Sequence, residues 1–219
     1  MTDEKTGKDF DVVAALVNNK LKELSYKPTF FLQVQFIGYN HPDGRRAYLR
    51  SLCFVMQNAV RELFPDKVLV IDHSLPNGLY CELQETFKRE DGRPAAFHLE
   101  DEDLERIRRK MEDLISRDLP FTRKKMPSSE AMEIFRRNNQ KAKAELQESI
   151  GSFTCNVYSL DGNQDSFHGP LIPSTGLLKV FGITPVGDGF CLQPPTMTDF
   201  NRVMPIIRQS KIAAALEEE

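Results

Sequence analysis

The stretch 168–179, His-Gly-Pro-Leu-Ile-Pro-Ser-Thr-Gly-Leu-Leu-Lys, constrains the fold of this chain more than any other. Its prolines fix φ near about −65°, and its glycines accept positive φ and the close approach of neighbouring backbone. The stretch therefore predicts an ordered, sharply bent loop, here called the signature loop. A polar turn is expected before it, from Leu160 to Ser166, and a strand directly after its bend, over Leu177–Ile183. From the residues alone, the loop is interpreted as a structural turn.

The rest of the chain predicts an α+β fold with a mostly antiparallel sheet and packed helices. Asn18-Asn19 predicts a turn between two short strands, because Asn tolerates the left-handed region. Apolar residues at helical spacing predict a helix over about Arg45–Leu63. Further strands are expected at Phe30–Ile37, Lys67–Ile71, Leu79–Phe87, Thr122–Lys125, Phe153–Tyr158 and Phe190–Leu192, a charged hairpin loop at Lys88–Pro94, and helices after Asp103, after an N-cap at Ser128, at Lys141–Glu148 and over 198–219.

Composition sets the class of protein. The chain has 219 residues, an apolar content of 40% and a net charge of −3, which is typical of a globular protein without a bulk basic field. Its four cysteines occur singly and form no Cys-x-x-Cys pair, so we expect buried, reduced thiols rather than a zinc ribbon. No signal peptide and no apolar run of about 18 residues is found, so we expect a cytoplasmic protein that does not bind a membrane.

The signature loop resembles the second signature of the editing domain of threonyl- and alanyl-tRNA synthetases. That signature runs approximately Cys-x-Gly-Pro-His and, in the threonyl enzymes, Val-Pro-Ser-Thr-Gly. Gly169-Pro170 and the stretch 173–176, Pro-Ser-Thr-Gly, match it. Phe167 stands where the family has Cys, and Leu171 stands where it has His. The sequence keeps the frame of the loop and lacks two of its reactive residues.

In the same family, the Cys and His join a His-x-x-x-His pair on a helix to form a metal-binding or hydrolytic centre. The family places this pair shortly before a Leu-Phe-Pro, which is found here at 63–65. Counting back from it, the two histidine positions are occupied by Arg50 and Phe54, neither of which is an ordinary zinc ligand. The resemblance therefore implies no metal and no catalytic residue at this place, no zinc in the purified protein, and no deacylation of seryl-tRNA(Thr).

The resemblance also implies a pocket between this helix and the signature loop. Two interpretations are open: the apolar replacements fill a vacated site as core, or Arg50 lines a cleft that binds a small anionic ligand or a nucleotide. If Gly176 has a positive φ, its replacement with alanine should also be destabilising. The candidate pocket residues are Arg50, Phe54, Tyr80, Asp165, Phe167, His168, Leu171 and Lys179.

The run Arg46–Val55 is similar to bacterial uridine-kinase-like nucleoside kinases, which carry a TGS (β-grasp) and a synthetase-like region ahead of a P-loop kinase domain. That similarity implies a partial TGS segment at 1–44, an editing-like domain at 45–196 and a helical linker at 197–219 toward an absent kinase domain. The chain is then a non-catalytic binding or regulatory module without a cofactor. ATP and Mg²⁺ belong to the kinase domain, its expected partner in cis.

Two other functions remain open. One is an aminoacyl-tRNA editing hydrolase that uses altered residues. The other is a module that binds tRNA or another RNA without chemistry, through the basic groups 123–125 and 106–110.

Overall fold

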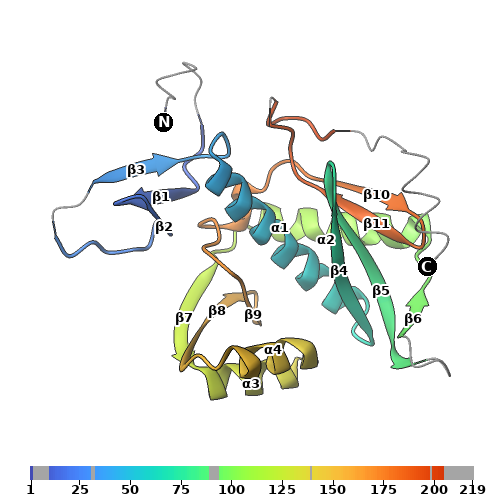
Figure 1. Ribbon diagram of the computed structural model, residues 1–219. Helices are drawn as coiled ribbons and strands as arrows, with labels where there is room; N and C mark the ends of the chain where they lie inside the picture. The colour runs from blue at the N-terminus through green and yellow to red at the C-terminus, as the bar shows by residue number, and fades with distance from the viewer. Residues whose placement is uncertain (2–9, 31–32, 89–93, 139, 198, 205–219) are drawn as a thin grey trace. The chain divides into compact units, whose positions relative to one another are not determined.

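The computed structural model describes residues 1, 10–30, 33–88, 94–138, 140–197 and 199–204 (Figure 1). These residues form two compact units. The first unit contains the described residues within 1–54 and 117–177, and the second contains those within 55–116 and 178–219. Every strand pair in the described residues is antiparallel, and four α-helices accompany the sheets, so the predicted α+β class is confirmed. None of the described helices is long and apolar enough to cross a membrane.

The first unit begins with a three-stranded sheet in the order β2-β1-β3. Strands β1 (Ala14–Val17) and β2 (Lys20–Lys22) are joined by Asn18 and Asn19, whose φ values are 48° and 61°. Two successive left-handed residues form the tight hairpin that suits the twist of paired strands, as predicted from Asn-Asn. The third strand, β3 (Val34–Ile37), is shorter than the predicted Phe30–Ile37 and pairs with β1.

Helix α1 (Pro42–Leu63) begins three residues before the predicted start. Pro42 occupies the first helical position, where the missing N–H of a proline is not needed. The backbone N–H of Asp43 donates to Nδ1 of His41 at 3.2 Å, which satisfies one of the unpaired N–H groups at this helix end. Gly44 meets the preceding backbone closely, since a Cβ there would lie 1.9 Å from the carbonyl oxygen of Gly38.

A second sheet of the first unit has the order β7-β8-β9 and comprises β7 (Thr122–Pro127), β8 (Thr154–Leu160) and β9 (Asn163–Ser166). Helices α3 (Ser128–Arg137) and α4 (Lys141–Ile150) pack beside it (Figure 1). Their shared core is apolar and consists of Met126, Ala131, Ile134, Phe135, Ala144, Cys155 and Val157.

Two predictions for this part of the chain are wrong. Ser128 is not the N-cap of α3, because Pro127 occupies that position and the Ser128 hydroxyl instead donates to the carbonyl of Ser152 at 2.5 Å. The stretch predicted as a polar turn before the signature loop contains strand β9, and only Asp161 and Gly162 form the turn. Polar residues form this strand because β8 supplies the backbone partners.

The second unit holds the remaining sheet, in the order β10-β11-β5-β4, with β6 paired to β5. Tight turns at Pro76-Asn77 and Gly187-Asp188 each connect two antiparallel strands of this sheet. Arg108 of the accompanying helix donates to the carbonyl of Ile183 at 2.8 Å. The elements are β4 (Lys67–Leu75), β5 (Gly78–Lys88), β6 (Pro94–Phe97), α2 (Asp101–Ser116), β10 (Gly182–Val186) and β11 (Gly189–Gln193).

The strand predicted over Leu177–Ile183 is misplaced, because pairing with β11 starts only at Gly182. The apolar character of the run reflects burial of residues such as Leu178, which is fully buried without belonging to a strand. An apolar run of this length signals burial more surely than it signals strand geometry.

The helix predicted over 198–219 is also wrong in its described part, 199–204. Thr196 and Asp199 exchange hydrogen bonds that close a turn there, and Pro195 and Val203 form an isolated bridge. The remainder of that helix, and most of the predicted hairpin loop at 88–94, lie outside the described residues. The division into segments 1–44, 45–196 and 197–219 stays a prediction.

Candidate functional site: a filled editing-like site

The signature loop is fixed by hydrogen bonds to the segment that precedes β7. The backbone N–H of Leu119 donates to the hydroxyl of Thr175 at 2.9 Å, and the N–H of Thr175 donates to the carbonyl of Leu119 at 2.9 Å. The N–H of Phe121 donates to the carbonyl of Pro173 at 3.0 Å. Thr175 is fully buried, and it starts the short 3₁₀ turn η1 (Thr175–Leu177). The Pro-Ser-Thr-Gly part of the loop is therefore structural.

Asp118 explains the glycine at position 176. Its carboxylate accepts hydrogen bonds from the hydroxyl of Ser174 at 2.5 Å and from the N–H of Gly176 at 3.1 Å. A Cβ on Gly176 would lie 2.3 Å from that carboxylate oxygen. The condition on which we predicted strain at Gly176, a positive φ, is not met. The glycine of the loop that has a positive φ is Gly169, with φ 117°. At position 176, glycine leaves room for the carboxylate of Asp118, which a Cβ would meet.

Arg50 of α1 holds the other end of the loop. Its guanidinium donates to the carbonyl oxygen of Pro170 through Nε at 3.2 Å and through Nη2 at 2.8 Å. A Cβ on Gly169 would lie 3.1 Å from Cζ of Arg50, so glycine lets the loop pass over the flat guanidinium. Burial lowers the pKa of Arg50. In the described residues no carboxylate forms an ion pair with it, and the Pro170 carbonyl is its main partner.

The next turn of the same helix face is aromatic. The ring centroid of Phe54 lies 5.2 Å from that of Phe167 and 6.0 Å from that of Phe121. Phe54 is fully buried, and the exposed fraction of Leu171 is 2%. Tyr158 approaches Phe167 edge-on at 6.1 Å. Phe54 and Leu171 are thus buried, and Phe167 is half-buried against the ring of Phe54.

Asp165 forms an ion pair with Lys143, which sequence reasoning did not identify. The Lys143 ammonium donates to the fully buried Asp165 carboxylate and lies 5.4 Å from the ring centroid of Phe167. The same carboxylate accepts from the side-chain amide of Gln140 at 2.9 Å and from the N–H of Ser166 at 2.7 Å. Lys143 lies in the first turn of α4 and Gln140 is the N-cap residue before it, and no local sequence signal connects that helix with β9.

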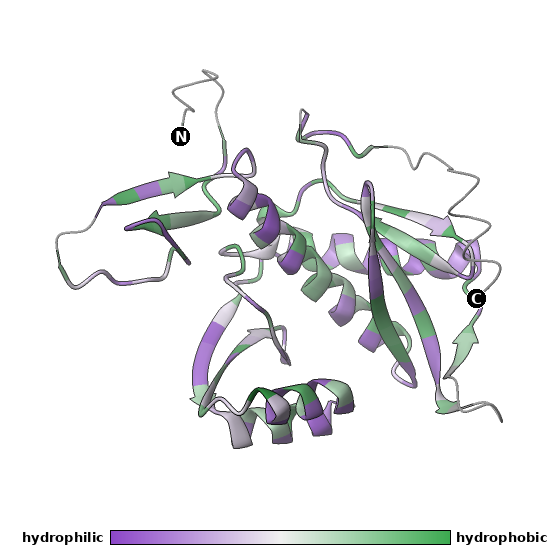
Figure 2. Cartoon of the chain, viewed as in Figure 1, coloured by the Kyte–Doolittle hydropathy of each residue, from purple (hydrophilic) through white to green (hydrophobic). Residues whose placement is uncertain are grey.

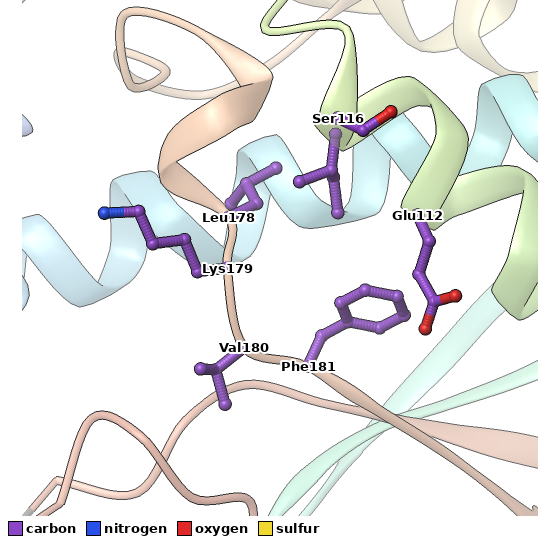
Figure 3. A pocket seen from close by; sticks show the side chains of 7 residues that line it. Glu112, Ser116, Leu178, Lys179, Val180 and Phe181 are labelled. Atoms are coloured by element: carbon purple, nitrogen blue, oxygen red, sulfur yellow. The ribbon is translucent and has the colours of Figure 1, made fainter.

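The other three candidates are placed differently. His168 is exposed on the signature loop. Tyr80 is buried in the second unit, its ring stacked on His73 at 5.0 Å, and burial raises its pKa to about 12. Lys179 is exposed in the second unit beside a hollow of about 280 Å³ that Glu112 and Phe181 also line (Figure 3). The structure thus brings together Arg50, Phe54, Asp165, Phe167 and Leu171 within the first unit, and the pocket predicted from all eight residues stays a prediction.

The chain is similar to threonine–tRNA ligases. It is 28% identical over 178 residues to the enzyme of Francisella tularensis subsp. novicida (strain U112), a match that covers 81% of this chain and 26% of that protein. It is 27% identical over the same length to the enzyme of Francisella tularensis subsp. tularensis (strain SCHU S4). The chain thus spans about a quarter of the length of these relatives. No family model matches the sequence.

These similarities agree with the editing-domain-like α+β fold expected from the signature loop. They overturn the identification of the chain as the front of a uridine-kinase-like nucleoside kinase, because the proteins that match over 81% of the chain are threonine–tRNA ligases. The run Arg46–Val55, on which that identification depended, lies in helix α1 beside the signature loop. The absence of a cofactor and of zinc stays a prediction.

Replacing Arg50 with methionine tests its role as a clamp. The variant keeps an unbranched apolar stem and removes both hydrogen bonds to Pro170, so we expect the free energy of unfolding to fall by about 1–2 kcal/mol. Urea denaturation of both proteins measures the difference. A variant as stable as the parent would mean that Arg50 contributes nothing to the loop and is held there for a ligand.

Proposed function

We propose that this chain is an editing-domain-like module that binds tRNA and does not hydrolyse its ester. The observation that carries the proposal is that the loop frame is kept while Phe54, Phe167 and Leu171 fill the position of the reactive residues. Similarity to threonine–tRNA ligases along 81% of the chain, at 28% identity, supports a function in the same context.

The side chains at this place do not suit hydrolysis. Activation of water requires a general base or a metal ligand, and Phe and Leu provide neither. Arg50 stays protonated and directs its N–H groups to Pro170. Cys53, the neighbour of Phe54, is buried, and burial raises its pKa to about 12, so a thiolate nucleophile is not available at neutral pH.

The distribution of charge supports RNA as the partner of the first unit. The sequence of that unit contains 16 Lys and Arg against 13 Asp and Glu, whereas the second unit contains 13 against 19. The second unit's basic helix residues are neutralised locally: Arg106 pairs with Asp103, Arg109 with Glu105 and Lys110 with Glu62. An RNA backbone is therefore attracted to the first unit rather than to helix α2.

Strand β7 is the most basic part of that unit. Its residues Arg123, Lys124 and Lys125 are all exposed, and β7 is an edge strand of its sheet. Arg123 lies 3.3 Å from Glu23, and Lys124 lies 3.6 Å from Glu130. These two acids compensate at most two of the three positive charges, so the strand retains a net positive charge. Lysines on an exposed strand suit contacts to phosphate, which give affinity without sequence specificity.

Fluorescence anisotropy with labelled tRNA tests the proposal. We expect binding that weakens about 40-fold between about 50 and 200 mM salt, which corresponds to about three phosphate contacts. The double variant Lys124→Gln/Lys125→Gln should bind several-fold more weakly. Arg109→Gln, which removes an exposed charge from α2, is the matched control and should change affinity less than twofold. Absence of salt-dependent binding, or equal losses in both variants, would contradict the proposal.

A further inference from the structure

The sheet β2-β1-β3 presents an unusual combination of side chains on one face. Phe36, Ala15 and Lys22 lie opposite one another across the three strands, and Val34, Val17 and Lys20 form the next row. Residues opposite one another, and residues two apart along a strand, share a face of the sheet. Lys20, Lys22, Val34 and Phe36 therefore share one side, here called the aromatic–basic face.

Large apolar groups on this face are accessible to solvent. The exposed fraction is 47% for Phe36 and 43% for Val34. Ala15 and Val17, which occupy the middle of the two rows on the central strand, are buried. Figure 2 shows both hydrophobic and hydrophilic residues along β3, whose sequence is Val-Gln-Phe-Ile. Phe30, on the connection from β2 to β3, is 84% exposed. An uncovered phenylalanine on one edge strand, across the sheet from lysines on the other, is typical of a surface that binds a partner.

The charges around the sheet favour an anionic partner. Residues 14–37 contain three lysines and one acid, Glu23. The side chain of Glu23 is only 10% exposed; it accepts a hydrogen bond from the hydroxyl of Tyr158 and lies 3.3 Å from Nε of Arg123. The charge of Glu23 is thus compensated by Arg123 within the unit. No other acid of residues 14–37 offsets the charges of Lys20 and Lys22 on the aromatic–basic face. Lys22 also makes a cation–π contact, since its Nζ lies 4.8 Å from the ring centroid of Tyr26.

We propose that the aromatic–basic face binds unpaired nucleotides of an RNA. The inference rests on the proposed function and adds to it a second contact, separate from strand β7. Bases stack on the ring of Phe36, with Phe30 as a second stacking position, and Lys20 and Lys22 contact the phosphates. An aromatic ring on one edge of a sheet and lysines on the other edge are suited to this, because every base has a π-face and every phosphate linker carries a negative charge. Duplex RNA does not expose its bases for such stacking, so the face selects unpaired segments.

The test uses the whole chain and a fluorescein-labelled single-stranded RNA decamer of cytidines and adenosines. Wild-type protein is expected to bind it, and a duplex of the same length is expected to bind more weakly. Phe36→Ser should weaken decamer binding about fivefold to a hundredfold, the range that corresponds to loss of one stacked base. Phe153→Ser is the matched control, because Phe153 is 95% exposed elsewhere in the same unit, and it should leave affinity unchanged.

Several results would overturn the inference. Equal losses in the two serine variants, or no decamer binding by the wild type, exclude the face as an RNA site. So does a change in sedimentation of Phe36→Ser without a change in RNA affinity, since the face then covers a second protein chain. If tRNA still binds through Lys124 and Lys125 while Phe36→Ser has no effect, the inference fails and the proposed function stands. If neither RNA binds the wild type, both fail.

Discussion

Replacing Phe54 with alanine is expected to lower the free energy of unfolding by about 3–5 kcal/mol. Phe54 is fully buried, and its ring packs between those of Phe121 and Phe167. Truncation removes the contacts with both rings and leaves a cavity beneath the signature loop. Urea denaturation at constant pH measures the change, with Phe153→Ala as the control, because an almost fully exposed ring should contribute less than about 0.5 kcal/mol.

The same variant separates the two interpretations of Phe54, Phe167 and Leu171, which are core packing and the lining of a ligand cleft. If Phe54 is core, the loss of stability is large and is not recovered by adding nucleotides or phosphate. A loss smaller than about 1 kcal/mol would mean that the ring lines an open cleft and is not held by its neighbours.

Replacing Lys143 with methionine should destabilise the chain by about 2–3 kcal/mol. The substitution leaves the fully buried carboxylate of Asp165 without its cation, and an unpaired buried charge is costly. This loss is at or below the lower end of the range of about 3–5 kcal/mol that is usual for breaking a buried ion pair. The reasons are that the side chain of Lys143 is 34% exposed and that Gln140 and the N–H of Ser166 still donate to the carboxylate.

The double variant Lys143→Met/Asp165→Asn provides the control. The amide carries no charge, so the double variant should be more stable than Lys143→Met alone, with a coupling free energy of at least about 1 kcal/mol between the two positions. Strictly additive effects in this cycle would show that the ion pair does not contribute to the packing of α4 against β9.

Local signals in the sequence predicted the parts of the fold that depend on neighbouring residues. Asn18-Asn19 determines its hairpin because both residues tolerate positive φ. The apolar stripe of α2 correctly predicted a helix that buries Leu104, Ile107 and Met111. The Gly-Pro pattern correctly predicted an ordered bend, and the helical period placed Arg50 and Phe54 on one face of α1.

The parts that sequence reasoning missed depend on long-range partners. Strand β9 is polar and forms only because β8 supplies its hydrogen bonds. Lys143 reaches Asp165 across 22 positions of sequence, and neither residue has a local pattern that points to the other. The kinase identification failed for a related reason: it depended on the short run Arg46–Val55, whereas similarity along 178 residues relates the chain to threonine–tRNA ligases.

The central claim is that the editing-like frame is kept without its hydrolytic chemistry. Incubation of the purified chain with seryl-tRNA(Thr), followed by measurement of the released serine, tests it most directly. We expect release at the rate of the buffer alone, at protein concentrations that bind the tRNA. Turnover well above that rate, abolished by replacing the exposed His168 with alanine, would contradict it.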